Sequence, residues 1–306
     1  MKNCMLSVII TTYKRSDTLD RAINSVLCEN GDYEVIVVDD NDENSEYRIS
    51  TENDMQKYLK NNNFLYLKHK KNKNGAAARN TGIKAAHGKY ITFLDDDDEF
   101  VKDRIPMIIE AMENGADFVC TGIIYKKNGQ KVGAKHPNIS DKNVQKLQCD
   151  ILSQKSFIGT GSNMVCRTKL VREIEGFDEE FIRHQDLEFL IRYLEKCKKV
   201  VELKEKLVVK NIDSSINFPS FDKLYSVKKM FFSKFQSLIS SQDLKIQKEI
   251  YKRNINELIK AACNSAKKEN IVESIKFAKK YNVYSFIDFN YIYFRACVKR
   301  LVKGAK

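Results

Sequence analysis

The sequence predicts an α/β fold with a mixed, mainly parallel sheet, followed by an α-helical C-terminal region. Short apolar runs rich in β-branched and aromatic residues alternate with amphipathic stretches in the first half of the chain, which is the pattern of strands joined by crossover helices. Several of these runs end in polar or acidic residues. Beyond residue 220, Gly and Pro nearly disappear and Lys-rich helical patterns follow. We therefore expect two domains, at residues 1–220 and 221–306.

The first domain opens with elements that alternate in type. Residues 16–27 carry apolar side chains at helical spacing after a capping Ser or Asp, and Gly88 ends a later helix. In chain order, we expect a strand at 6–13, a helix at 16–27, strands at 33–40 and 64–67, a helix at 75–86 and a strand from residue 89 onward. This order predicts parallel pairing, as in the first half of a nucleotide-binding α/β domain.

The most informative stretch is residues 89–98, an apolar run that ends in four consecutive carboxylates, Asp95 to Asp98. A buried strand delivers such acids to the edge where open α/β sheets bind ligands. Four adjacent like charges repel one another unless solvent or a cation screens them. Hard divalent cations prefer carboxylate and phosphate oxygens. The functional interpretation is a site for a metal and a diphosphate, and the alternative is a solvated acidic turn.

A second acidic strand end, Asp39-Asp40, is expected at the same edge, with Tyr13 just past the end of the first strand. An aromatic ring can stack on a nucleobase, and a carboxylate can accept hydrogen bonds from a base N–H or a ribose hydroxyl. The sequence has no Gly-rich phosphate loop of either common type. Bound phosphates would therefore need a metal and cationic side chains. Tyr13 is otherwise an ordinary surface aromatic.

Residues 185–194 predict a helix with one buried stripe, because Leu187, Leu190, Ile191 and Leu194 recur at helical spacing. Asp186 falls in the first turn and off that stripe, where the helix N-terminus favours the ionised carboxylate. Such a group is free to act as a general base. It is equally well explained as an acid that stabilises the helix start.

Five pieces of the chain, in order, resemble family 2 of the glycosyltransferases, whose nucleotide-sugar-binding, Rossmann-like domain has the GT-A fold. They are Ser7–Arg15 (opening strand), Val37–Asn41 (nucleoside-binding acidic turn), Ala78–Ile83 (Ala-Arg-Asn helix), Tyr90–Asp98 (Asp-x-Asp) and Gly176–Glu179 followed by Gln185–Glu188 (base region). The resemblance covers roughly residues 6 to 200. Gln185 and Glu188 depart from the family's common Glu-Asp-x-Asp, whereas Asp186 is retained.

The resemblance implies how the donor's nucleoside is held. Thr11 and Tyr13 would contact the nucleoside, with Tyr13 against the base. Asp40 would bind the base or the ribose, with Asp39 beside it. Arg79 would lie near the donor's ribose or phosphates; its alternative role is a salt bridge on its own helix.

The resemblance also implies the reacting groups. Asp95 and Asp97 would form the Asp-x-Asp that holds Mn²⁺ or Mg²⁺, with Asp97 the more direct ligand. The four-Asp run leaves this register ambiguous by one, so Asp96 could share in binding the donor. Asp186 would be the base. Apart from the resemblance, Ser162 follows Gly161 in a predicted loop and is a candidate for lining the acceptor side.

The implied reaction is the transfer of one sugar with inversion at the anomeric carbon, because a base across the sugar from the leaving group needs a single displacement. The donor is expected to be a UDP-linked sugar. The acceptor is expected to be a glycan or an undecaprenyl-linked saccharide, in capsule, O-antigen or other surface polysaccharide assembly. The chain has no Trp, and so lacks the Gln-x-x-Arg-Trp motif of the family's processive synthases.

Composition bounds the location. The chain of 306 residues is 42% hydrophobic, which is enough for a packed core. Its 8 Cys are dispersed without zinc spacing, so we expect reduced thiols in a cytoplasmic protein. The N-terminus leads directly into a strand pattern, so we expect no signal peptide. No run approaches the ~20 apolar residues that span a bilayer.

The net charge of +12 lies entirely in the second domain: residues 221–306 hold 19 Lys and Arg against 7 Asp and Glu. Residues 284–302 mix aromatic and aliphatic side chains with Arg and Lys. A basic helix with an aromatic face can lie on an anionic membrane surface, which makes this region a candidate for peripheral contact with the inner face of the cell membrane. The alternative is a solvated helical cap. No nucleic-acid motif accompanies the basic tail, so we expect no nucleic-acid partner.

Two other functions remain open. A sugar-phosphate nucleotidyltransferase would keep the nucleotide site, but it would need a glycine-rich basic loop after the first strand, and residues 12–16 lack the glycines. A non-catalytic scaffold that binds nucleotide sugars or membranes would be suggested by loss of the acids, which are present.

Overall fold

The computed structural model describes residues 4–137, 139, 143–156, 158, 161–212, 219–265, 267–284 and 294. The chain forms two compact units, which we call the sheet unit (Met1–Gln148 and Ser156–Ser215) and the helical unit (Cys149–Lys155 and Ile216–Lys306). The helical unit thus includes a short segment that lies inside the expected first domain, and the domain limits 1–220 and 221–306 stay a prediction. The stretch expected at a membrane, residues 284–302, lies outside the described residues apart from Tyr284 and Phe294.

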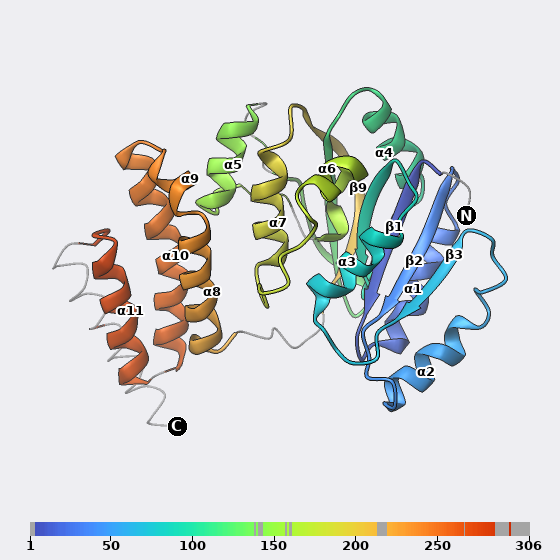
Figure 1. The fold of residues 1–306 in the computed structure, drawn as a ribbon, viewed down its shortest axis with the longest axis horizontal. Coiled ribbons are helices and arrows are strands. Elements are labelled where there is room, and N and C mark those ends of the chain that lie inside the picture. The colour runs from blue at the N-terminus through green and yellow to red at the C-terminus, as the bar shows by residue number, and fades with distance from the viewer. Residues whose placement is uncertain are drawn as a thin grey trace. The chain divides into compact units, whose positions relative to one another are not determined.

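Among the described residues, nine strands form one mixed sheet in the order β3-β2-β1-β4-β8-β6-β9-β5, with β7 paired to β6. Figure 1 shows β1, β2 and β3 side by side. The strands are β1 (Leu6–Thr12), β2 (Tyr33–Asp39), β3 (Phe64–Lys68), β4 (Tyr90–Asp95), β5 (Asp98–Phe100), β6 (Phe118–Lys127), β7 (Gln130–Lys135), β8 (Val165–Arg167) and β9 (Val200–Asn211). Strand β1 pairs in parallel with β2 and β4, and β2 pairs in parallel with β3, as the order of elements predicts. Strand β8 is antiparallel to β4 and β6.

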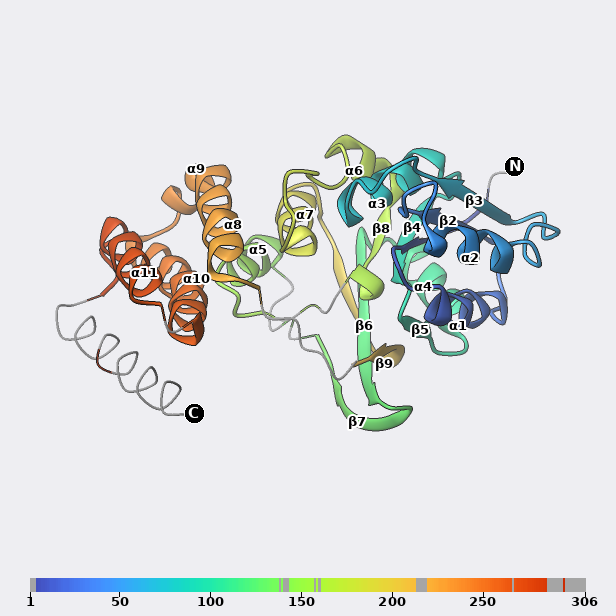
Figure 2. The same cartoon turned by 90° about the horizontal axis from the view of Figure 1, so that it is seen from below.

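Helices cover both faces of the sheet. The helices of this part of the chain are α1 (Ser16–Leu27), α2 (Glu46–Met55), α3 (Gly75–Ala85), α4 (Arg104–Glu113), α5 (Val144–Leu152), α6 (Thr168–Glu173) and α7 (Gln185–Leu194). Figure 2 shows α3 and α6 on one face and α1 and α4 on the other. Because successive strand residues point to opposite faces, Leu6, Val8 and Ile10 join the core beneath α1 and α4, whereas Ile9 meets Gly82 of α3.

The sequence analysis missed two elements that matter for the site. Helix α2 has few apolar residues, so it lacks the pattern that predicts a packed helix. It contacts the sheet through the buried Arg48, which forms an ion pair with the buried Asp39. Strand β5 has only three residues, which are too few to show the alternating pattern that predicts a strand. It turns the chain directly after the acidic run and pairs antiparallel with β9.

The described part of the helical unit consists of α8 (Phe221–Lys234), α9 (Gln236–Ser240), α10 (Leu244–Ser265) and α11 (Lys268–Lys280). Its core is aromatic: the Phe232 ring lies 5.8 Å from Phe277 and 4.8 Å from Tyr281, measured between centroids. The buried Lys228 is neutralised by Glu257, whose carboxylate lies 2.7 Å from the ammonium. Across the described residues, no helix is long and apolar enough to cross a membrane. The expected fold class, an α/β unit with an α-helical C-terminal region, is confirmed.

We predict that Gly82→Ala lowers the free energy of unfolding by about 1–3 kcal/mol, because overpacking a core costs that much. A Cβ at this position would lie 2.4 Å from Ile9 Cγ2, where α3 packs on β1. Urea unfolding of the two proteins measures the difference. Gly133→Ala on β7 is the matched control, because a Cβ there meets nothing within 4 Å. Equal stability of the two variants would contradict the close packing of α3 on β1.

Candidate active site

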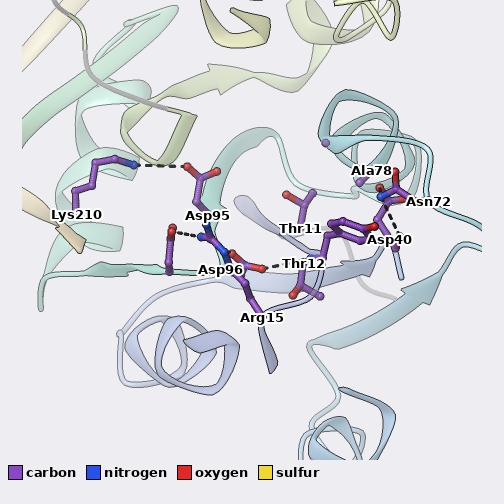
Figure 3. A pocket seen from close by; sticks show the side chains of 12 residues that line it. Thr11, Thr12, Arg15, Asp40, Asn72, Ala78, Asp95, Asp96 and Lys210 are labelled. Carbon is purple, nitrogen blue, oxygen red and sulfur yellow. Dashed lines mark hydrogen bonds and ion pairs between the residues drawn. The ribbon is translucent and has the colours of Figure 1, made fainter. Parts of the chain in front are cut away.

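A cleft of about 370 Å³ opens where β1, β2 and β4 end, at the carboxyl edge of the parallel strands. It is lined by six of the predicted site residues: Thr11, Tyr13, Asp40, Asp95, Asp96 and Asp97. Arg15, Asn72 and Lys210 line it too (Figure 3). In that view Asp40 and Asn72 lie on one side of Thr11, and Asp95 and Lys210 lie on the other.

The turn between β4 and β5 sends the four consecutive acids to different partners. Asp95, at the end of β4, accepts a hydrogen bond from Arg79 Nη2 at 2.8 Å, and Lys210 Nζ lies 3.9 Å from its Oδ2. Asp97 forms an ion pair with Arg15. Burial opposes ionisation of Asp95, but Arg79 and Lys210 outweigh it and hold the Asp95 pKa below its usual range.

Asp96 turns toward the end of β1, where its Oδ2 accepts a hydrogen bond from the backbone N–H of Tyr13 at 3.4 Å. Its carboxylate is nearly inaccessible to solvent, and Arg15 Nη1 lies 3.5 Å away. Burial, together with the charges of Asp97 and Asp95, raises the pKa of Asp96 to about 7.

Asp98, which the sequence analysis did not select, is fully buried at the start of β5. Its Oδ2 accepts a hydrogen bond from Ser162 Oγ at 2.7 Å and lies 3.4 Å from Lys210 Nζ. Burial raises the pKa of Asp98 to about 7. Ser162 is itself fully buried, and its hydroxyl also accepts from the backbone N–H of Asp95 at 3.0 Å. The expectation that Ser162 lines the acceptor side is therefore wrong: it supports the acidic turn from behind.

Three of the acids fit a divalent cation. Carboxylate oxygens of Asp95, Asp97 and Asp98 lie within 4.8 Å of one another. Hard cations bind through such oxygens. The buried Oδ1 of Asp98 has no hydrogen-bond partner among the described residues, so a cation would satisfy it. The predicted ligands Asp95 and Asp97 belong to this cluster, and their role stays a prediction.

Arg79 of α3 connects the acidic turn to the start of α7. Its Nη2 contacts Asp95, and its Nη1 donates to Gln185 Oε1 at 3.1 Å.

The next residue, Asp186, does not line the cleft itself. Its Oδ2 accepts from the backbone N–H of Gly161 at 3.0 Å, and its Oδ1 is buried with no partner among the described residues. Burial raises the Asp186 pKa, although Arg79 opposes this. A buried carboxylate with an unused oxygen and a raised pKa has the properties of a general base.

Asp39 does not reach the cleft, which corrects the expectation that it binds the donor beside Asp40. It is fully buried, and its Oδ2 accepts from Arg48 Nε at 2.8 Å and from the Tyr66 hydroxyl at 2.6 Å. These bonds hold α2 and β3 against the end of β2. Asp39 is therefore a structural anion, whereas its neighbour Asp40 turns to the cleft.

Lys210 is the cleft residue that sequence reasoning could least have found. It stands opposite Asp98 in the antiparallel register of β5 and β9, two strands far apart along the chain. Its side chain is partly buried and its ammonium lies near Asp98 and Asp95, whose charges raise the Lys210 pKa against the effect of burial. Arg15 could have been found, because it lies just beyond Tyr13 in the opening motif.

This fold and cleft define an α/β protein with a cluster of carboxylates at the carboxyl edge of its parallel strands, where open α/β sheets bind their ligands. Residues 7–175 match the model of Glycosyl transferase family 2, and the chain belongs to that family. The family prediction is confirmed.

Three relatives are named as glycosyltransferases or glucosyltransferases. The chain is 35% identical over 169 residues to an uncharacterised glycosyltransferase of Rickettsia conorii, covering 52% of this chain and 26% of that protein. It is 32% identical to the amylovoran biosynthesis glycosyltransferase AmsB of Erwinia amylovora, covering 63% of this chain and 64% of that protein. It is 29% identical to a GalNAc(5)-diNAcBac-PP-undecaprenol beta-1,3-glucosyltransferase of Campylobacter jejuni, covering 62% and 60%. The chain thus spans less than two thirds of each of these relatives.

Solved structures share the fold. The S. aureus TarS fragment 1-349 superposes with a TM-score of 0.63 at 17% identity, covering 97% of this chain and 89% of that one. The same fragment in complex with UDP-GlcNAc superposes with a TM-score of 0.61 at 17% identity, covering 91% and 88%. At this identity the likeness concerns the fold alone.

We predict that Arg79→Met destabilises the sheet unit more at pH 8 than at pH 5. Losing charged hydrogen bonds to Asp95 costs about 1.5–3 kcal/mol. Without the guanidinium the pKa values of Asp95 and Asp186 rise, and protonation at pH 5 relieves part of the cost. Thermal or urea unfolding at the two pH values measures the effect, with Arg79→Lys as the control that retains the charge. A pH-independent loss would contradict this arrangement of charges.

Proposed function

We propose that this protein is an inverting, metal-dependent glycosyltransferase that moves one sugar from a UDP-linked donor to a glycan or an undecaprenyl-linked saccharide, in surface polysaccharide assembly. The observation that carries the proposal is that Asp40, Tyr13 and the Asp95–Asp97 turn, which come from separate strand ends, line a single cleft. Membership of glycosyl transferase family 2 supports the same class of reaction.

The proposed donor spans the cleft, with its nucleoside toward Tyr13 and Asp40 and its diphosphate toward the acidic turn. The Tyr13 side chain is 39% exposed, so its ring is available to a base. Arg15 and Lys210 bring positive charge to the diphosphate end. Mn²⁺ or Mg²⁺ held by Asp95 and Asp97, with Asp98 behind them, would stabilise charge on the departing nucleotide.

In the proposed reaction, the acceptor oxygen bonds to the anomeric carbon while the bond from that carbon to the diphosphate oxygen breaks. The nucleotide leaves with the electron pair, and Asp186 takes the proton from the acceptor hydroxyl. One displacement inverts the configuration. The raised pKa of Asp186 makes it a stronger proton acceptor than an exposed carboxylate. Arg79 and Gln185 position it relative to the acidic turn.

The acceptor and location rest on the relatives and on charge. The Campylobacter relative is named for an undecaprenol-linked acceptor and the Erwinia relative for a polysaccharide, which supports acceptors of these classes. The TarS fragment was solved with UDP-GlcNAc, which supports a UDP-linked donor. The excess of Lys and Arg in residues 221–306 supports peripheral contact with an anionic membrane from the cytoplasmic side.

Metal dependence tests the proposal. In the presence of Mn²⁺ or Mg²⁺, the protein should release UDP from at least one member of a panel of UDP-sugars, and EDTA should abolish the release. Asp97→Asn should lower the rate by about 100-fold or more, the scale of losing one electrostatic stabiliser. Asp103→Asn, which neutralises an exposed acid nearby, should leave it unchanged. UDP release that persists in EDTA, or equally in both variants, would count against the proposed site.

The role of Asp186 predicts a kinetic and a pH effect. Asp186→Asn retains an acceptor for the Gly161 N–H but cannot take a proton, so kcat should fall by about 10²–10⁴-fold while UDP binding is retained. In the wild type, activity should fall as the pH drops through the raised Asp186 pKa, above the usual Asp range near 4. Steady-state rates and UDP titrations measure both. A variant that keeps wild-type kcat would exclude Asp186 as the base.

A further inference from the structure

The hairpin of β6 and β7 extends away from the rest of the sheet unit. Its turn is Asn128-Gly129, with φ of +50° and +76°, which is the left-handed backbone that a two-residue hairpin turn requires. Every residue of β7 except Gly133 is exposed, and Figure 2 shows β7 and the end of β6 beyond the helices that cover the sheet. The tip of the hairpin is therefore open to a partner.

The charges at this tip are all positive. Residues 118–140 contain no Asp or Glu, whereas Lys126, Lys127 and Lys131 lie on either side of the turn. Lys126 and Lys131 stand directly opposite one another in the antiparallel register. Like charges at opposite positions of a strand pair destabilise it. Within the described part of the chain, none of these three lysines forms an ion pair, so a partner that supplies negative charge would relieve their repulsion.

The three lysines lie on both faces of the hairpin. Successive strand residues point to opposite faces, so Lys126 and Lys127 point apart, and Lys131 shares the face of Lys126 because the two are paired. The register shift between Tyr125 and Lys126 leaves Val132 as the extra residue of β7, and its side chain is 58% exposed. One small anion would need its ligands on one side. Charge on both faces, around an exposed apolar residue, suits a ribbon that enters a layer of anionic groups.

We propose that the β6–β7 hairpin is a contact surface for an anionic phospholipid bilayer. Its three lysines contact lipid phosphates, and Val132 enters the boundary between the headgroups and the acyl chains. Lysine ammonium groups are point charges that suit a field of phosphates, whereas the planar guanidinium of Arg suits a single phosphate held by two hydrogen bonds. This surface belongs to the sheet unit and is separate from the membrane contact proposed for residues 221–306.

The strand that carries these lysines also borders the cleft. Tyr125, two residues before Lys127, pairs in register with Lys210 of β9, which lines the cleft. At about 3.4 Å per residue, Lys127 lies about 7 Å further along the strand. A bilayer held at the hairpin would therefore present a lipid-linked saccharide close to the cleft. This consequence rests on the proposed function, whereas binding of the hairpin to a bilayer does not.

A single tryptophan tests the contact directly, because the chain has no Trp. Val132→Trp in the full chain places a fluorescent probe on the hairpin. Ile49→Trp on α2 is the matched control, because Ile49 is 56% exposed. Vesicles of phosphatidylcholine and phosphatidylglycerol in equal parts should shift the emission of Val132→Trp to shorter wavelength, since the indole moves into the bilayer interface. They should not shift the emission of Ile49→Trp, and vesicles of phosphatidylcholine alone should shift neither.

Charge variants measure the electrostatic part of the contact by co-sedimentation with the same vesicles. Changing Lys126, Lys127 and Lys131 together to Gln should weaken binding to the anionic vesicles by about 10- to 100-fold, on the scale of three lysines at an anionic surface. It should also abolish the emission shift of Val132→Trp. The control removes the same charge by changing three exposed lysines elsewhere in the sheet unit to Gln and should alter binding by no more than about twofold. These lysines are Lys60, Lys84 and Lys169.

The other outcomes overturn the inference in distinguishable ways. If neither triple variant changes binding, the membrane contact proposed for residues 221–306 acts without the hairpin. If both weaken binding equally, only net charge matters. If the hairpin variant aggregates but binds vesicles as the wild type does, its lysines only protect the β7 edge from pairing with another chain. If Ile49→Trp shifts as Val132→Trp does, the hairpin is not the surface that enters the bilayer. Release of UDP without vesicles tests the proposed reaction separately from all of these results.

Discussion

The site depends on how four consecutive carboxylates are distributed at the end of β4. Side by side they would repel one another, yet the turn into β5 gives each of them a hydrogen-bond or ion-pair partner. Asp95 contacts Arg79, Asp96 accepts from the backbone N–H of Tyr13, Asp97 pairs with Arg15, and Asp98 contacts Ser162 and Lys210. The result is a cluster of carboxylate oxygens whose negative charge is only partly neutralised by the nearby Arg and Lys side chains. An edge of this kind offers the oxygen ligands and the negative charge that a divalent cation prefers, and the proposed diphosphate site rests on this.

The side chains that neutralise these carboxylates come from distant parts of the sheet unit, so the geometry of the site depends on the packing of the whole unit. Arg79 lies on α3, which packs closely on β1 because Gly82 lies against Ile9. Lys210 is delivered by the pairing of β9 with β5. Through Arg79 and Gln185 the same charges reach the start of α7, where Asp186 lies. A shift of any one element would change the charge balance at the other end of this chain of contacts.

The sequence predicted what is local, namely the parallel strands, the helix that carries Arg79 and the acids at the strand ends. It missed what depends on register between distant strands, such as Lys210 opposite Asp98. It also did not distinguish the structural role of Asp39 from the cleft position of Asp40, because two adjacent carboxylates give the same signal in a sequence. Only the fold shows that the buried Arg48 pairs with Asp39. The sequence did not predict Asn72 as a cleft residue, because an exposed Asn in a loop has no sequence pattern that places it at a site.

The most direct test of this account is the position of a bound cation. Crystals grown with UDP and Mn²⁺ should give an anomalous difference peak at the manganese edge, within coordination distance of Asp95 or Asp97 and of the UDP diphosphate. A peak at another surface, or UDP bound away from the β4–β5 turn with no cation beside these carboxylates, would contradict the central claim that the acidic turn holds the donor through a metal.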